Sequence, residues 1–259
     1  MLDSLVAWFV ENQRPLPWRV SYDPYHVWVS EVMLQQTQVP RVINRYKSFI
    51  KKFPTARTLA KASLSAVLKE WSGLGYNRRA KYLHDAAKRI IDEYHGDVAV
   101  ALHHPLQGVG PYTRAAVKVF ALNEPDVLLE TNIRTVFIHH FFPRRESVAD
   151  QELMPWVIEA AKGQDPRTWH WALMDYGVHL KKLHGNPSRK SAHHAKQSRF
   201  EGSLRQVRGA ILRELHVRPR SEASLVSLIR PNKGYLKKAL ASLARDGLIT
   251  KQKGKWQIA

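Results

Sequence analysis

Apolar residues recur every three or four positions along most of the chain, which is the spacing of amphipathic helices. Segments with this spacing lie at residues 2–12, 24–49, 55–68, 81–95, 127–142, 150–161 and 169–180. Before residue 245, no segment sustains the alternation of apolar and polar residues that is typical of a half-buried strand. We therefore predict that the first two hundred residues are all-helical.

Helical spacing resumes after residue 203 and gives way to a hairpin at the end of the chain. Three helices and then two short strands are predicted, at residues 204–215, 221–229, 232–245, 248–250 and 255–258. Three helices followed by a two-stranded ribbon is the order of a winged-helix domain. The expected organisation is an all-α domain at 1–200, ending in a basic loop at 181–200, and a small winged-helix (α+β) domain at 203–259.

The chain is strongly basic, with 41 Lys and Arg against 22 Asp and Glu and a net charge of +19. This excess indicates a polyanionic partner, most simply nucleic acid, with an anionic membrane surface as the alternative. No apolar run approaches the roughly 20 residues of a spanning helix. The N-terminus also lacks the pattern of a secretion signal. We expect an intracellular monomer, in the cytoplasm or nucleoid, that does not bind a membrane.

A glycine-rich turn at Pro105–Arg114 stands at the centre of the sequence. Gly108 and Gly110 allow a tight bend, and Pro111 suits the first turn of a following helix. Such a bend, with Val109 at its tip, directs backbone N–H groups and a positive helix end outward, where a phosphate can bind. A plain connection between helices is the alternative.

A second turn, Trp71–Ala80, carries Leu74 and Tyr76 at its tip. If these side chains are exposed, they are able to wedge between stacked bases, with Arg78 and Arg79 on phosphates. If both face inward, the turn is a helix connector. Gln36 and Thr37 present amide and hydroxyl groups that can hydrogen-bond to base edges, unless they are simply solvated.

Three further segments carry candidate binding residues. The strap Arg14–Arg19 contains two prolines and is expected to be extended, either lining a pocket or serving as a rigid linker. Lys233 and Lys237 fall on the third helix of the winged helix and suit phosphates; a protein-contacting wing is the alternative. His179, His184, His193 and His194 follow no zinc spacing, so phosphate contact is favoured over a metal.

Five motifs together resemble the helix-hairpin-helix (HhH-GPD) DNA glycosylases, and among them the MutY-like adenine glycosylase branch. The resemblance covers about residues 1–200 and implies two helical lobes that bind double-stranded DNA containing a mismatched or damaged base. The motifs are Arg14-Pro-Leu-Pro-Trp-Arg19, Ser30-Glu-Val-Met-Leu-Gln-Gln-Thr-Gln38, Gly73-Leu-Gly-Tyr76, Gly108-Val-Gly-Pro-Tyr-Thr113 and Met174-Asp-Tyr-Gly177.

The resemblance assigns roles to matching residues. Glu31 matches the general acid, and Glu130 lies where the family usually carries aspartate; Asp126 is the weaker candidate for that second role. Tyr112 stands where lyase-type members carry lysine, which implies that no Schiff base forms there. The base-pocket matches are Arg14, Leu16, Trp18 and Arg19, and the DNA-contacting matches are Gln36, Thr37, Leu74, Tyr76, Gly108, Val109, Gly110 and Thr113.

Three departures from the family pattern bear on function. The chain has no cysteine, so no 4Fe-4S cluster is expected, and no other cofactor is predicted. Trp171 stands where adenine-removing members carry an amide or carboxylate facing the base. The usual C-terminal domain that recognises 8-oxoguanine is replaced by the winged helix.

The expected activity is monofunctional removal of adenine opposite guanine or 8-oxoguanine in base excision repair. The alternative within this class is removal of thymine, uracil or an oxidised pyrimidine, which Trp171 favours. The alternative from another class is a non-catalytic winged-helix DNA-binding protein, against which the retained pair Glu31 and Glu130 argues.

Overall fold

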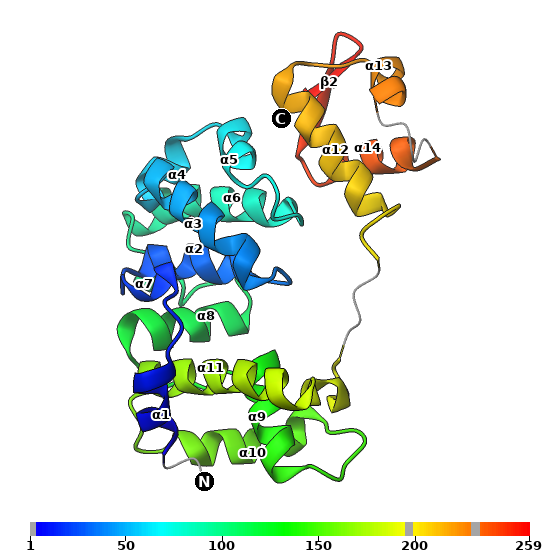
Figure 1. The fold of residues 1–259 in the computed structure, drawn as a ribbon. Coiled ribbons are helices and arrows are strands. Elements are labelled where there is room, and N and C mark those ends of the chain that lie inside the picture. Colours follow the sequence, from blue (N-terminus) through cyan, green and yellow to red (C-terminus); the bar gives the residue numbers. More distant parts are fainter. Residues whose placement is uncertain (1–3, 195–198, 229–233) are drawn as a thin grey trace. The chain divides into compact units, whose positions relative to one another are not determined.

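The computed structural model describes residues 4–194, 199–228 and 234–259 of the chain. The structure consists of two compact units. Unit 1 comprises Met1–Trp28 and Gly110–Lys196, and unit 2 comprises Val29–Val109 and Gln197–Ala259. Both are helical, as the sequence predicted, and unit 2 adds a two-stranded hairpin (Figure 1). Within the described ranges, no helix has the length and apolarity that a membrane crossing requires.

Unit 1 is built around α11, which packs against α1 and α9. Its elements are α1 (Leu5–Asn12), the 3₁₀ turn η1 (Pro17–Arg19), the first half of α2 (Pro24–Leu34), α8 (Pro111–Val117), the π turn η2 (Lys118–Leu122), α9 (Thr131–Phe141), α10 (Asp150–Ala161), α11 (Pro166–His184) and the 3₁₀ turn η3 (Pro187–Lys190). Figure 1 shows α11 running beside α9.

A glycine sets the spacing between α9 and α11. A Cβ atom added at Gly177 would lie 2.3 Å from the backbone oxygen of Asn132, so only glycine fits this contact. Ile133 and Leu173 are fully buried in the same region. The close approach brings side chains at the start of α9 next to those of α11.

In the N-terminal part of unit 2, α6 packs against α4, α5 and α7. Its core is aromatic, with Phe49 and Trp71 fully buried at a ring-centroid distance of 6.0 Å. The elements are the second half of α2, α3 (Val39–Lys52), α4 (Ala56–Lys61), α5 (Leu64–Glu70), α6 (Arg78–Tyr94) and α7 (Val98–Ala101).

The C-terminal segment of unit 2 has the predicted order of three helices and a hairpin. Its helices α12 and α14 pack on each other and on the strands, and Leu225, Leu243 and Leu248 are fully buried. The strands pair antiparallel, from Ile249 with Ile258 to Gln252 with Lys255. The elements are α12 (Leu204–Val217), α13 (Glu222–Leu228), α14 (Leu236–Arg245), β1 (Ile249–Gln252) and β2 (Lys255–Ile258).

Two predicted boundaries are wrong. The helix expected at 24–49 is interrupted: α2 ends at Leu34 and α3 begins at Val39, with Gln36 in a left-handed conformation between them (φ 53°). The basic loop expected at 181–200 begins later, because α11 continues to His184 and η3 follows. The helix persists because Lys181 is half-buried and bonded to α9. The predicted domain division at 1–200 and 203–259 stays a prediction.

Candidate active site

Glu130 directly precedes α9 and caps its N-terminus. Its Oε1 atom accepts hydrogen bonds from the backbone amides of Asn132 at 2.7 Å and Ile133 at 2.9 Å. Its Oε2 atom accepts a third from the Asn132 side-chain amide at 3.2 Å. Backbone amides of a first helical turn have no partner within the helix, and the helix dipole adds a positive potential there. Three donors from one turn therefore fix the direction of this carboxylate.

Lys181 of α11 adds a positive charge beside this cap. Its Nζ atom donates to Asn132 Oδ1 at 2.7 Å, so the Asn132 side chain bridges the ammonium group and Glu130. Burial raises the pKa of Glu130, whereas the backbone amides of Ile133 and Asn132 and the charge of Lys181 oppose that rise. Burial in turn lowers the pKa of Lys181. The interior favours the neutral carboxyl, and its donors favour the charged one.

Tyr112 lies in the first turn of α8, and it is one of the residues that influence the pKa of Arg134. The pKa of Arg134 is raised first by its hydrogen bond to Asp150, further by the negative charges of Asp150 and Glu130, and by Tyr112 when its phenol is ionised. Arg134 donates to the two Asp150 oxygens at 2.8 and 2.7 Å. Tyr112 and Glu130 therefore both lie close enough to Arg134 to influence its pKa.

Asp126, the alternative to Glu130, has different surroundings. Its Oδ1 atom accepts from the backbone amide of Val127 at 2.7 Å, and its Oδ2 atom lies 3.6 Å from Lys118 Nζ. Its side chain is 38% exposed. Asp126 therefore lacks the helix cap that holds Glu130.

Glu31 lies in the interior of α2, in the part that belongs to unit 2. The residue is only 7% exposed, and Trp28, Val32 and Met33 on the same helix are buried. Burying a carboxyl group costs free energy that a well-packed apolar side chain would not incur. Packing alone therefore does not explain a glutamate at this position.

The strap at 14–19 is held by an acidic residue on α11. Asp175 accepts from the backbone amide and Nε of Arg14 at 2.8 and 2.6 Å, and from both terminal nitrogens of Arg19 at 2.8 and 2.9 Å. Burial alone would raise the pKa of Asp175, but the hydrogen bonds and charges of the two arginines lower it overall. This bidentate arrangement fixes the strap. The strap is not fully extended as expected, because it contains η1.

One of the predicted base-pocket residues, Arg19, lies against Trp171. The Trp171 ring stacks on Phe120 at 5.8 Å with an interplanar angle of 15°, and the Arg19 guanidinium lies 5.2 Å from its centroid. Leu16 and Trp18 are buried. Arg19 thus contacts both Asp175 and Trp171, which joins the strap to α11.

The turn at 105–110 has the tight geometry that the sequence predicted. Gly108 has a φ of 81°, and a Cβ atom there would lie 2.7 Å from Cβ of Tyr82 on α6. Gly110 is the N-cap of α8, and Val109 and Thr113 are buried. Phosphate binding at this turn stays a prediction.

The turn at 71–80 is closed from within by Arg79. Its guanidinium donates to the backbone oxygens of Val32, Met33 and Gln35 at the end of α2, and to Thr37 Oγ1. Burial lowers the pKa of Arg79 to about 10. A guanidinium bonded in this way stabilises the end of α2 and is not directed at solvent.

The side chains at the tip of this turn differ. Leu74 is buried, so the inward interpretation applies to it. Tyr76 is half-buried with a φ of 46°, and Gln36 is exposed with a φ of 53°. Left-handed conformations at non-glycine residues cost free energy and tend to collect at functional sites. Arg78 is exposed, at 57% of its side chain.

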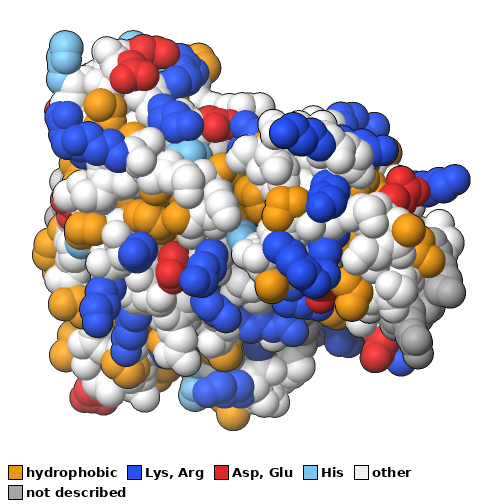
Figure 2. Space-filling model, turned by 90° about the horizontal axis from the view of Figure 1, so that it is seen from above, with side chains coloured by type: hydrophobic (Ala, Val, Ile, Leu, Met, Phe, Trp, Pro, Cys, Tyr) orange, Lys and Arg blue, Asp and Glu red, His pale blue; other side chains and the backbone are white. Residues whose placement is uncertain are grey.

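Basic side chains are spread over the face of the molecule in Figure 2, with few acidic ones among them. Lys237, predicted to contact phosphates, is exposed on α14. Lys233 lies outside the described residues. The charge distribution suits a polyanion, as the composition indicated.

The sequence contains no cysteine, so an iron–sulfur cluster held by thiolates cannot form. In the part of the chain that the structure describes, no group of three or more His, Cys, Asp or Glu residues could hold a metal ion. The His184 ring instead stacks on His139 at 4.8 Å.

The sequence predicted no role for three residues that organise these contacts: Asp175, which lies in the fifth motif, Asn132 and Lys181. A usable signal existed for Asp175, because two arginines close together on a short strap need an acidic partner. For Asn132 and Lys181 no local signal exists, since they are 49 positions apart and meet only through the packing of α9 on α11.

Comparison with known sequences places this geometry in a family. Residues 29–157 match the profile of the HhH-GPD superfamily base excision DNA repair proteins. An adenine DNA glycosylase of Mycobacterium tuberculosis (strain CDC 1551 / Oshkosh) is 33% identical over 284 residues, covering 96% of this chain and 90% of that protein. The adenine DNA glycosylase of Homo sapiens is 40% identical over 144 residues, which is 51% of this chain and only 26% of the human protein.

Solved structures share the fold at lower identity. A thermostable thymine-DNA glycosylase superposes with a TM-score of 0.59 and 24% identity, covering 68% of this chain and 84% of that one. Endonuclease III in a non-covalent complex with DNA superposes with a TM-score of 0.60 and 20% identity, covering 71% and 85%. Together with the nearly full-length mycobacterial match, these findings show that the chain belongs to the HhH-GPD superfamily of base excision repair DNA glycosylases.

Proposed function

We propose that the protein is a monofunctional DNA glycosylase that removes adenine opposite guanine or 8-oxoguanine. The observation that carries the proposal is the Glu130 carboxylate, which three donors hold at the start of α9 beside the Lys181–Asn132 pair. A protein that only bound DNA would gain nothing from a carboxylate kept near its ligand's phosphates. Support for adenine comes from the mycobacterial relative, which is named for that base.

The proposed reaction divides the chemistry between two carboxyl groups. Glu31 protonates the departing base as the bond between C1′ and the base nitrogen breaks, which leaves positive charge on the sugar. Glu130, ionised, stabilises this oxocarbenium-like state and helps water to add to C1′. Tyr112 supports the sugar. The products are the free base and an abasic site in an intact strand.

The absence of a lyase step follows from Tyr112. A phenol cannot form the Schiff base that an amine would form with the opened sugar, so the strand is not cleaved by elimination. Gln36, Thr37 and Tyr76 are proposed to contact the opened base stack. Gly108, Val109, Gly110 and Thr113 are proposed to hold the strand that carries the flipped nucleotide.

Removal of thymine, uracil or an oxidised pyrimidine opposite guanine is the second candidate, because of Trp171. Its ring stacks on Phe120 and lies under Arg19, so this position supplies an aromatic ring and no amide or carboxylate. An aromatic face binds any base but reads the Watson–Crick edge poorly. Such a pocket would select by shape.

An excision assay tests the proposal and separates the two candidates. End-labelled duplexes carrying A·G, A·8-oxoG, T·G, U·G or an oxidised pyrimidine opposite G are incubated with the protein and then treated with alkali. We expect cleavage at the adenine of the first two duplexes. Cleavage confined to the pyrimidine duplexes would establish the second candidate instead.

Two controls complete the assay. Strand breaks before alkali treatment would contradict the monofunctional assignment. If no duplex is cleaved although each is bound, the protein is a non-catalytic DNA-binding protein and the proposal is wrong.

A further inference from the structure

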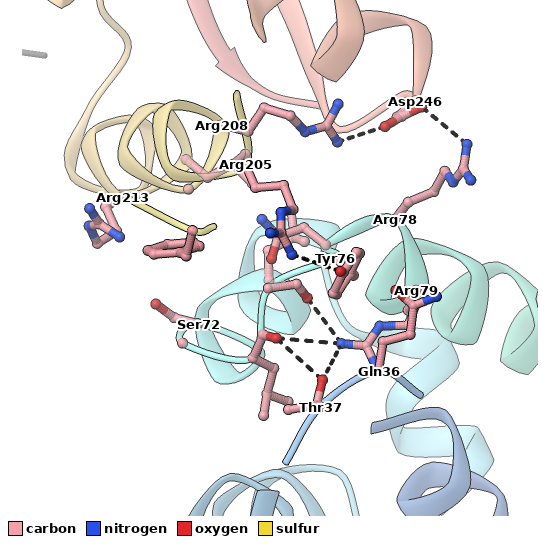
Figure 3. A pocket seen from close by; sticks show the side chains of 18 of the residues that line it. Gln36, Thr37, Ser72, Tyr76, Arg78, Arg79, Arg205, Arg208, Arg213 and Asp246 are labelled. Atoms are coloured by element: carbon pink, nitrogen blue, oxygen red, sulfur yellow. Dashed lines mark hydrogen bonds and ion pairs between the residues drawn. The ribbon is translucent and has the colours of Figure 1, made fainter. Parts of the chain in front are cut away.

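Unit 2 contains a pocket of about 980 Å³ that includes Gln36, Thr37 and Tyr76, the proposed contacts to the base stack, and extends beyond them to the C-terminal helices. One wall is formed by the turn between α2 and α3 and by the turn at 72–79, and the opposite wall by α12 and α14 (Figure 3). This volume lies at the upper end of the range of small-molecule pockets and would admit a nucleotide unit. The C-terminal segment therefore adds a surface to the turn that carries Tyr76.

The pocket is strongly basic. Among the described residues that line it, seven are arginines and one, Asp246, is acidic. Asp246 is already paired, at 2.7 Å with Arg208 and at 3.7 Å with Arg78 (Figure 3). A water-accessible cavity with this excess of fixed positive charge attracts a polyanion.

Three of the arginines that line the pocket have exposed side chains: Arg41, Arg213 and Arg245. In the part of the chain that the structure describes, no ion pair joins Arg41, Arg213 or Arg245 to an acidic side chain. The guanidinium of Arg79, by contrast, is occupied by backbone oxygens and Thr37. The first three are therefore the groups best able to bind phosphates, for which guanidinium geometry is well suited.

The pocket also contains an aromatic ring held between two cations. The Tyr76 ring lies 5.4 Å from the Arg79 guanidinium and 5.6 Å from that of Arg205, and its hydroxyl accepts from Arg205 at 2.8 Å. Gln36 lines the same pocket. A charged groove that contains an aromatic platform is the arrangement by which proteins hold unpaired nucleotides.

From these features we propose that the pocket binds the phosphodiester backbone of DNA beside the opened base pair, with Arg41, Arg213 and Arg245 as phosphate ligands. The inference rests on the proposed glycosylase function for the position of the DNA. It assigns the inner faces of α12 and α14 to DNA binding, in place of the exposed lysines of the hairpin and of the outer face of α14. Either strand can supply the phosphates, and the experiment distinguishes them.

The test measures binding of the full chain to a labelled mismatch duplex by fluorescence anisotropy, in a Glu31→Gln background so that the DNA stays intact. The pocket variant is Arg41→Gln/Arg213→Gln/Arg245→Gln. Its matched control, Arg218→Gln/Lys253→Gln/Lys255→Gln, removes the same charge from exposed positions outside the pocket. Thermal melts and the three single pocket substitutions identify any loss that is due to misfolding.

We expect the pocket variant to raise the Kd on the order of 10- to 100-fold at physiological salt, and to reduce the slope of log K against log salt by about 2 to 3. The control is expected to change Kd by less than about threefold, because its charges act only at long range. An equal or larger loss in the control would overturn the proposal and place the DNA on the outer face.

Neutral methylphosphonates identify the strand. They are placed next to the mismatch, in one strand or the other, and each duplex is measured with the parent and the pocket variant. For the strand that occupies the pocket, the substitution weakens the parent but has no further effect on the variant. If the losses are additive for both strands, the pocket does not bind the backbone. These readouts do not depend on excision, so a failed excision assay would leave them interpretable.

Discussion

Glu31 is buried and Glu130 is half-buried, and the chain holds these two carboxyl groups in different ways. Glu31 is 7% exposed and follows the buried Ser30 in a helix whose buried residues Trp28, Val29, Val32 and Met33 are apolar. Glu130 stands at a helix N-terminus, where backbone amides, Asn132 and the charge of Lys181 oppose the effect of burial. Environments that differ in this way allow two carboxyl groups to take opposite roles. The donors around Glu130 and the charge of Lys181 favour its ionised form against burial, which suits the charged role proposed for it and leaves Glu31 as the proposed proton donor.

The largest expected effect is that of Glu31→Gln, which removes the transferable proton and keeps the size of the side chain. Single-turnover excision should slow by about 10²- to 10⁴-fold, the usual range for loss of a general acid. DNA affinity should change little, because the amide retains the polar contacts. Excision at the parent rate would show that Glu31 is not the general acid, and the division of roles between Glu31 and Glu130 would be wrong.

Glu130→Gln is expected to reduce the single-turnover rate by about 10²- to 10³-fold, as for the loss of one electrostatic stabiliser. Stability should behave differently. Because the folded pKa of Glu130 is raised, protonation stabilises the folded state, and this contribution is lost as pH rises through the folded pKa. The neutral amide should therefore keep or increase the Tm at neutral pH, measured by calorimetry.

Asp126→Asn is the matched control for this prediction. Asp126 is more exposed and is not attached to the cap of α9, so its loss should alter excision only slightly. A larger loss in Asp126→Asn than in Glu130→Gln would reverse the assignment of the stabilising carboxylate.

The site could be predicted from the sequence only where its signals are local. The string around Glu31 and the glycine turn before Pro111 are contiguous, and the turn has the expected left-handed glycine. The end of α2 at Leu34 was missed although Pro40 signalled a new helix start. Arg79, more than forty residues away, donates hydrogen bonds to the backbone oxygens at the end of α2, and such a contact cannot be predicted from neighbouring positions.

The surroundings of Glu130 depend on distant contacts in the same way. The position of the carboxylate followed from the resemblance, but its partner Lys181 was assigned to a loop. Only the close packing of α9 on α11, which Gly177 permits, brings Lys181 to Asn132. The sequence therefore identified the carboxylate but did not predict the charged and polar groups that surround it.

Gly177→Ala sharpens the comparison by moving only one of the two carboxylates. The new Cβ atom would lie 2.3 Å from the Asn132 backbone oxygen, so α9 and α11 must separate. Overpacking of this kind typically costs about 1–3 kcal/mol, which calorimetry would detect as a lower Tm. Excision should also fall, because Asn132 orients Glu130. Gly234→Ala is the control, since a Cβ atom added there meets no other atom within 4 Å.

Lys181→Met should have the smallest effect on the maximal rate and the most specific effect on its pH dependence. The charge of Lys181 lowers the pKa of Glu130 against the effect of burial. Without that charge, the pKa of Glu130 rises further, and a larger fraction of the carboxylate is protonated at a given pH. Since the proposed reaction needs Glu130 ionised, the acidic limb of the pH–rate profile should move to higher pH, while the rate at alkaline pH recovers.

Lys182→Met provides the control, because it removes the same charge from the adjacent, exposed position. Its acidic limb should coincide with that of the parent. If both variants shift the limb equally, the effect comes from net charge and not from the Lys181–Asn132–Glu130 contact. If Lys181→Met lowers the rate at every pH without moving the limb, Lys181 positions Asn132 sterically, and the titrating group that limits the reaction at low pH is a residue other than Glu130.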